Sequence, residues 1–259
     1  MFAAGIDIGS TASKAVILAD DGSIAAKAIV PIGTGTVGPA RVFAQVLEMA
    51  GITRDDINWI TATGYGRFSF EGINDQKSEL SCHAKGISHL LPGTHTIVDI
   101  GGQDIKVMRI NDKGMLLNFV MNDKCAAGTG RFLDTMAKVL DVNVTDLSDL
   151  SFRADDPAEI SSTCTVFAES EVISKLASNI SLENIAAGIH KSVARRVASL
   201  VQRCSIQPDV AMSGGVALNK GLVHSLEEEI NHTIRVHEDC QLAGALGAAL
   251  YAYSSMKSA

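Results

Sequence analysis

The 259-residue sequence has no apolar run long enough to cross a membrane and no excess of basic residues. Spanning a bilayer takes roughly 18 or more consecutive apolar residues. Lysine and arginine total 22 against 29 aspartates and glutamates, so the net charge is −7 and no basic run offers a nucleic-acid footprint. The chain also starts without the basic-then-apolar order of a secretory signal. We therefore expect a cytoplasmic protein that binds neither membranes nor nucleic acid.

Cysteine is also scarce. The five cysteines are odd in number, widely spaced and without a CxxC pair, which excludes the disulfide framework of a small secreted protein. They are Cys82, Cys125, Cys164, Cys204 and Cys240. Their thiols remain for packing, catalysis or metal binding.

The chain contains an internal repeat. Residues 6–14 align without gaps with residues 98–106, and the register persists to a second turn, where Gly22 falls on Gly114. Each copy predicts three strands joined by two tight turns, followed by a helix–strand–helix pattern. The sequence therefore predicts a duplicated α/β fold with two lobes around a nucleotide cleft. We expect the first lobe over 1–93 and the second over 94–259, with a C-terminal helix that is able to return to the first.

Apolar periodicity and turn residues place the remaining elements. Strands are expected over 57–63, 209–213 and 233–236. Helices are expected over 39–50, 78–91, 130–140, 166–177, 183–203 and 241–253, with one more beyond residue 219.

Each repeat places an aspartate and a glycine where its first strand ends. Asp7 and Asp99 follow apolar residues, and a carboxylate in that position needs a partner to offset its desolvation. A hydrated Mg²⁺ supplies such a partner, because it keeps water ligands and uses few carboxylates. Gly9, Gly101 and Gly102 let backbone N–H groups approach phosphate oxygens closely. One such turn alone is an ordinary tight turn, but two copies in register favour a phosphate clamp.

A third glycine turn follows a strand at residues 212–219 and is weak evidence alone. Together, residues 5–18, 97–107 and 212–219 resemble the two phosphate motifs and the adenosine motif of the actin/Hsp70/sugar-kinase superfamily, which has a ribonuclease H-like fold. This resemblance implies ATP or ADP as ligand. It assigns catalytic roles to Asp7, with Gln103 or Asp104 orienting the attacking water. The phosphates would contact Ser10, Thr11, Ala12, Ser13 and Lys14, and the nucleoside Gly214, Gly215, Asn219 and Gln241.

Two cysteines stand directly before predicted helices. The free N–H groups of a helix N-terminus favour a thiolate or an anionic cluster beside Cys125 and Cys164. A buried structural cysteine is the alternative for each. Two thiolates cannot complete a four-cysteine site, but two chains related by a two-fold axis can, with either an iron–sulfur cluster or zinc.

The sequences around these cysteines, 125–132 and 162–171, resemble the activator components of the 2-hydroxyacyl-CoA dehydratases, as do residues 5–14, 62–67, 79–83 and 244–251. The resemblance implies a homodimer with one oxygen-sensitive [4Fe-4S] cluster, held by Cys125 and Cys164 of each chain. It also implies Mg²⁺ near Asp7 and Asp99, held through water, and an ATPase that passes an electron from reduced ferredoxin or flavodoxin to the dehydratase. The setting implied is anaerobic amino-acid fermentation.

Three other functions fit parts of the pattern. An ATPase subunit of a benzoyl-CoA reductase-like enzyme keeps the chemistry and changes the partner. A small dimeric kinase needs the same nucleotide cleft and no metal cluster. A nucleotide-gated binding module with structural zinc uses the same cysteines. No pocket for coenzyme A is evident in the sequence.

Overall fold

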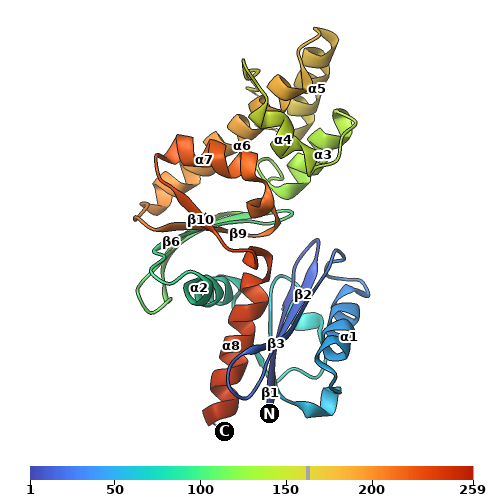
Figure 1. Cartoon of the computed structure of the whole chain (residues 1–259), viewed down its shortest axis with the longest axis vertical. Coiled ribbons are helices and arrows are strands. Elements are labelled where there is room, and N and C mark those ends of the chain that lie inside the picture. The colour runs from blue at the N-terminus through green and yellow to red at the C-terminus, as the bar shows by residue number, and fades with distance from the viewer. Residues whose placement is uncertain (162–163, 259) are drawn as a thin grey trace. The chain divides into compact units, whose positions relative to one another are not determined.

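The computed structural model describes residues 1–161 and 164–258. These residues form two compact units, shown with their elements in Figure 1. The first unit contains Met1–Thr94, Ile110–Leu117 and His237–Ala259. The second contains His95–Arg109 and Asn118–Val236.

The first unit is built on a five-stranded mixed sheet with helices on both faces. Its strand order is β3 (Ile24–Val30), β2 (Ser13–Leu18), β1 (Phe2–Ile8), β4 (Ile57–Thr63) and β5 (Asp75–Gln76). β1 pairs antiparallel with β2 and parallel with β4. Successive residues of β2 point to opposite faces of the sheet, as the period of two in a strand requires. Ile17 packs with α1 (Gly38–Ala50), whereas Val16 packs with α8 (Ala243–Ser258).

Small residues allow a close helix crossing in the first unit. α2 (Glu79–Leu90) packs against α8, and α8 packs against β1. A methyl group on Gly247 would overlap the carbonyl oxygen of Cys82, and one on Gly86 would overlap that of Ala243. The backbones therefore approach more closely than any side chain permits.

Gly247→Ala is accordingly expected to lower the free energy of unfolding by about 3 kcal/mol or more, because the backbone of α2 must move to admit the methyl group. Ser254→Ala, on the exposed face of α8, is the control and is expected to change it by less than about 0.5 kcal/mol. Urea unfolding followed by circular dichroism measures both. Equal stability of the two variants would contradict the close crossing.

The second unit repeats the strand arrangement of the first. Its strand order is β10 (Ile234–Val236), β9 (Val210–Ser213), β6 (Thr96–Ile100), β7 (Ile105–Ile110) and β8 (Leu116–Asn122). As in the first unit, the first strand along the chain pairs antiparallel with the second and parallel with the fourth. The prediction of a duplicated α/β fold is confirmed.

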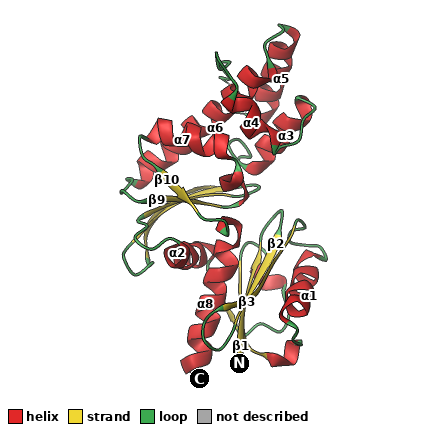
Figure 2. Cartoon of the chain, viewed as in Figure 1, coloured by secondary structure: helices red, strands yellow, loops and turns green. Residues whose placement is uncertain are grey.

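Among its described residues, the second unit also contains five α-helices, and Figure 2 distinguishes them from its strands. They are α3 (Gly130–Val139), α4 (Asp146–Phe152), α5 (Thr165–Ala177), α6 (Leu182–Cys204) and α7 (Lys220–Ile230). α6 packs with α4 and α7, and α3 packs with α5. Among the described residues, no helix is both long and apolar enough to cross a membrane.

Candidate functional site

In the first unit, Asp7 is a buried carboxylate at the end of β1. It lies opposite Lys14 in the antiparallel ladder, and the Lys14 Nζ donates to its Oδ2 at 3.1 Å. Asp7 is 1% exposed, yet its Oδ1 accepts no hydrogen bond from any described residue. A Cβ added to Gly64 would lie 2.5 Å from this oxygen. Because an unsatisfied buried acceptor is unfavourable, the arrangement fits a ligand that binds Oδ1, such as Mg²⁺ or one of its waters.

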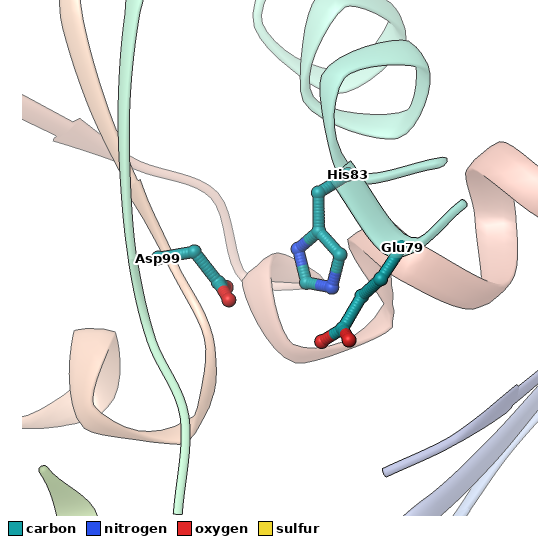
Figure 3. Close-up of side chains that lie close together, drawn as sticks. All are labelled: Glu79, His83 and Asp99. Atoms are coloured by element: carbon teal, nitrogen blue, oxygen red, sulfur yellow. The ribbon is translucent and has the colours of Figure 1, made fainter. Parts of the chain in front are cut away.

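In the second unit, Asp99 occupies the matching position at the end of β6 and is labelled in Figure 3. It lies opposite Lys106, whose Nζ is 3.5 Å from the Asp99 Oδ2 and 2.7 Å from the Asp104 Oδ2. Ser213 donates its hydroxyl to the Asp99 Oδ1 at 2.7 Å. The duplication thus extends to a pair in each unit that joins a buried aspartate to a lysine, half-buried at Lys14 and buried at Lys106. Sequence reasoning did not single out Lys106 or Ser213 as site residues.

The two polar residues predicted after the second loop differ in their surroundings. Asp104 is held by Lys106, whereas Gln103 is exposed and makes no side-chain hydrogen bond to another described residue. Gln103 is therefore the one free to turn toward a ligand.

The first phosphate loop is closed by its own backbone. The Gly9 N–H donates to the Ala12 carbonyl at 3.1 Å, and the Gly9 carbonyl accepts from the Thr34 N–H at 2.9 Å. Ser13 is fully buried and donates its hydroxyl to the Ile32 carbonyl at 2.9 Å, so this hydroxyl stabilises the conformation of the loop. Ser10 is half-buried and Thr11 is exposed.

The second phosphate loop is hydrogen-bonded to the start of α3. The Gly101 carbonyl accepts from the Gly130 N–H, and the Gly102 carbonyl accepts from the Arg131 N–H, both at 2.9 Å. These are the first two residues of α3, whose N–H groups have no partner within the helix. The loop that carries Cys125 therefore runs directly into a helix capped by the phosphate loop.

The third glycine turn follows β9 and leads to α7. Gly214 has φ of 86°, a left-handed conformation that favours glycine. Asn219 caps α7 by accepting from the Leu222 N–H at 3.0 Å, and the Gly221 N–H donates to the Ser148 hydroxyl at 2.9 Å. Because protein groups already satisfy these donors, this turn differs from a phosphate-binding helix start. Gln241 is half-buried in the first unit.

His190 of α6 holds Asn219 in place, and sequence reasoning did not find it. The Asn219 Nδ2 lies 3.0 Å from the His190 Nε2, and His190 is fully buried. Since Asn219 already accepts through its oxygen, Nδ2 donates and the imidazole accepts as a neutral ring. Burial lowers the pKa of His190 to about 4.

This lowered pKa predicts a pH dependence of stability. The unfolded chain takes up a proton near pH 6.5 and the folded chain does not, so the stabilisation is complete above pH 6.5 and is lost as pH falls toward 4. Between pH 7.5 and 5, wild type should lose about 2 kcal/mol more than His190→Gln, which lacks this proton. Denaturant unfolding at both pH values measures the difference, and equal losses would contradict it.

The five cysteines fall into two groups. Cys82, Cys204 and Cys240 are fully buried. Burial raises the pKa of the Cys82 thiol to about 12 and raises that of Cys204. These three are structural, as their positions in the sequence indicated. Cys125 is half-buried and Cys164 is exposed, so the two accessible thiols are the predicted cluster ligands.

Both accessible cysteines precede helices that pack together. Cys164 immediately precedes Thr165, the first residue of α5, and Cys125 lies in the loop before α3. Neither sulfur is hydrogen-bonded to a described residue, and residues 162 and 163 of the predicted motif lie outside the described residues. Val166 and Phe167, beside Cys164, are 66% and 67% exposed. Accessible thiols on an uncovered apolar surface fit a cluster shared with a second copy.

Comparisons with known proteins identify the family of the chain. The chain matches the BadF/BadG/BcrA/BcrD ATPase family over residues 4–252. It is 55% identical over 254 residues to the (R)-2-hydroxyglutaryl-CoA dehydratase activating ATPase of Acidaminococcus fermentans, covering 98% of this chain and 97% of that protein. It is 34% identical over 212 residues to a benzoyl-CoA reductase subunit of Thauera aromatica, covering 80% of this chain and 75% of that protein.

A solved structure of the 2-hydroxyisocaproyl-CoA dehydratase activator from Clostridium difficile, with bound ADPNP, superposes with a TM-score of 0.97 at 53% identity, covering all of this chain and 96% of that one. The resemblance to the dehydratase activators, predicted from the motifs, is therefore confirmed. By its sequence and its structure, this chain belongs to the BadF/BadG/BcrA/BcrD ATPase family.

Proposed function

We propose that the protein is the ATP-dependent activator of a 2-hydroxyacyl-CoA dehydratase. In this proposal, a homodimer takes an electron from reduced ferredoxin or flavodoxin and passes it to the dehydratase while it hydrolyses ATP. The observation that carries the proposal is the pair of hydrogen bonds from Gly130 and Arg131 to the second phosphate loop. These bonds join a nucleotide-binding element to the loop that bears Cys125.

The nucleotide would be bound by groups that the repeat supplies twice. Asp7 and Asp99 would face Mg²⁺ through water, and the glycines of both loops would offer backbone N–H groups to the phosphates. Gln103, whose side chain is free, would orient the attacking water, while Lys106 keeps Asp104 in place. Gly214 and Gly215 would line the nucleoside pocket. Asn219 would act as the helix cap that fixes this turn.

Cys125 and Cys164 of each copy would hold one [4Fe-4S] cluster, which accepts and donates single electrons. The N–H groups at the starts of α3 and α5 would stabilise the negative charge that the thiolates bring. The exposed Val166 and Phe167 would be covered by the second copy. Two thiolates per chain make the second copy a requirement for the cluster.

Coupling between nucleotide and cysteines would follow the hydrogen bonds described above. A change in the position of Gly101 and Gly102 alters the acceptors that cap α3, and so moves the loop before that helix. ATP must bind the two arrangements unequally for this to drive electron transfer. Hydrogen bonds and solvent around the sulfurs set the potential of such a group.

The alternative functions fit less well. A benzoyl-CoA reductase-like role has support from the relative in Thauera aromatica, but at 34% identity against 55% for the dehydratase activating ATPase. A kinase leaves two accessible cysteines at neighbouring helix starts without a role. Structural zinc would use the four thiols but would not carry an electron.

The test is reconstitution under anaerobic conditions. The purified protein is mixed with an inactive 2-hydroxyacyl-CoA dehydratase, reduced ferredoxin and MgATP, and dehydration of the acyl-CoA is followed. Activity is expected only when all components are present, and not when ADP replaces ATP. Dehydration without ATP, or none with any of a panel of 2-hydroxyacyl-CoA substrates and their dehydratases, would contradict the proposed function.

A further inference from the structure

One arginine of the first unit has no assigned role. Arg67 follows β4, and its Nη1 donates to the Gly64 carbonyl at 3.0 Å. Its guanidinium carbon lies 4.3 Å from the centre of the Phe68 ring. Arg67 forms no ion pair with a carboxylate among the described residues. The guanidinium is therefore held in place, and its remaining N–H groups are available to an anion.

The turn that carries Arg67 is bound to the first phosphate loop. The Gly66 N–H donates to the Ile8 carbonyl, and the Thr34 N–H donates to the Gly9 carbonyl, both at 2.9 Å. Thr34 also packs directly on Gly66, because a Cβ added to that glycine would overlap the Thr34 hydroxyl oxygen. All of these residues belong to the first unit. The backbone that precedes Arg67 is thus fixed against the loop that follows β1.

Gly64 links the guanidinium to the end of β1 as well. A Cβ added to Gly64 would lie 2.5 Å from the Asp7 Oδ1, and the carbonyl of the same glycine accepts from the Arg67 Nη1. Standard bond lengths then place this nitrogen at most about 10 Å from the Asp7 carboxylate. Lys14, the cation of the loop itself, is already paired with Asp7 at 3.1 Å. Arg67 therefore adds a positive charge beside the first phosphate loop that no carboxylate neutralises.

We propose that Arg67 binds the terminal phosphate of ATP and so gives the protein a higher affinity for ATP than for ADP. A guanidinium presents paired N–H donors that match two oxygens of one phosphate. A terminal phosphate offers three acceptor oxygens and nearly two negative charges, so it still has acceptors for Arg67 when loop N–H groups also bind it. The proposal rests on the proposed function, because that function places ATP on the first phosphate loop.

Phe68 prepares the guanidinium for this contact. Stacking on the ring and the hydrogen bond to Gly64 limit the conformations of the Arg67 side chain before the nucleotide arrives. A side chain that is already ordered loses less conformational entropy when it binds. Phe68→Leu keeps the charge and removes the stacking, so it should weaken binding of the terminal phosphate less than the loss of Arg67 does.

The test compares ADPNP, which is not hydrolysed, with ADP. Both are titrated with Mg²⁺ into the whole, anaerobically purified protein, and isothermal titration calorimetry gives the two affinities. Arg67→Gln should weaken ADPNP binding on the order of 10- to 100-fold, because charge-assisted hydrogen bonds are lost. It should change ADP binding less than about threefold. Arg67→Lys keeps the charge without the paired donors, and its loss of ADPNP affinity should lie between these values.

Arg41→Gln is the matched control, since Arg41 is an exposed arginine of α1 in the same unit. It should keep both affinities, and retained ADP binding by Arg67→Gln shows that this variant keeps its fold. Equal losses of ADPNP and ADP affinity in Arg67→Gln, or no loss of either, would overturn the proposal. The titration uses neither ferredoxin nor dehydratase. A protein that binds ADPNP through Arg67 and activates no dehydratase would therefore contradict the proposed function alone.

Discussion

Replacement of either Cys125 or Cys164 by serine is expected to remove nearly all iron and sulfide from the anaerobically purified protein. Wild type should contain about four iron atoms per dimer if one [4Fe-4S] cluster is bound by four cysteines. A dimer of either single variant keeps only two thiolates, one per chain, and two ligands do not hold such a cluster. Iron analysis and the visible absorption band that thiolate–iron bonding produces measure the loss.

The fully buried Cys240 provides the control. Cys240→Ala should keep its iron, because its side chain is 0% exposed and has no route to a shared cluster. All three variants should bind ATP with near wild-type affinity, since none of these cysteines is among the residues assigned to the nucleotide. Iron retained in Cys164→Ser would contradict the ligand assignment. If wild type contained zinc in place of iron, the four-thiolate site would stand but the proposed electron transfer would be contradicted.

The duplicated arrangement of strands was predictable because short-range sequence patterns specify it. The repeated Asp–Ile–Gly segments place Asp7 opposite Lys14 and Asp99 opposite Lys106, as the tight turn between two antiparallel strands requires. α4 and β5 were not predicted. α4 has seven residues, too few for a clear helical period, and β5 has two.

The side chains that complete the site were not predictable, because their roles depend on partners distant in sequence. Ser213 reaches Asp99 across 114 residues, and His190 reaches Asn219 across 29. His83 was part of a quoted motif, but its proximity to Asp7 depends on the return of α8, which brings Gly244 beside both. For Ser13, a distant partner uses a group to which sequence reasoning assigned another role. Its position in the loop predicted a phosphate contact, whereas its hydroxyl donates to the Ile32 carbonyl.

Asp7→Asn is expected to reduce MgATP hydrolysis on the order of 10²–10³-fold. The amide has the size of the carboxylate and fits between Gly64 and Gly244, but it lacks the charge that attracts Mg²⁺. Because Oδ1 has no hydrogen-bond donor among the described residues, its charge serves a ligand more than the fold. The free energy of unfolding should fall by roughly 1–3 kcal/mol, because the amide replaces the charged partner of the Lys14 Nζ, which lies 3.1 Å from the Asp7 Oδ2. Steady-state phosphate release and urea unfolding measure the two effects.

Measurements of nucleotide binding distinguish a loss of Mg²⁺ attraction by Asp7 from a general disruption of the nucleotide site. Without Mg²⁺, Asp7→Asn should bind ATP within about threefold of wild type, and the added affinity that Mg²⁺ gives should be lost. Asp20→Asn is the matched control, since Asp20 pairs with Lys257 in a turn of the same unit and is half exposed. Its turnover should equal that of wild type. If Asp7→Asn hydrolysed MgATP at the wild-type rate, the buried oxygen would face no metal, and the first repeat would contribute only its backbone to phosphate binding.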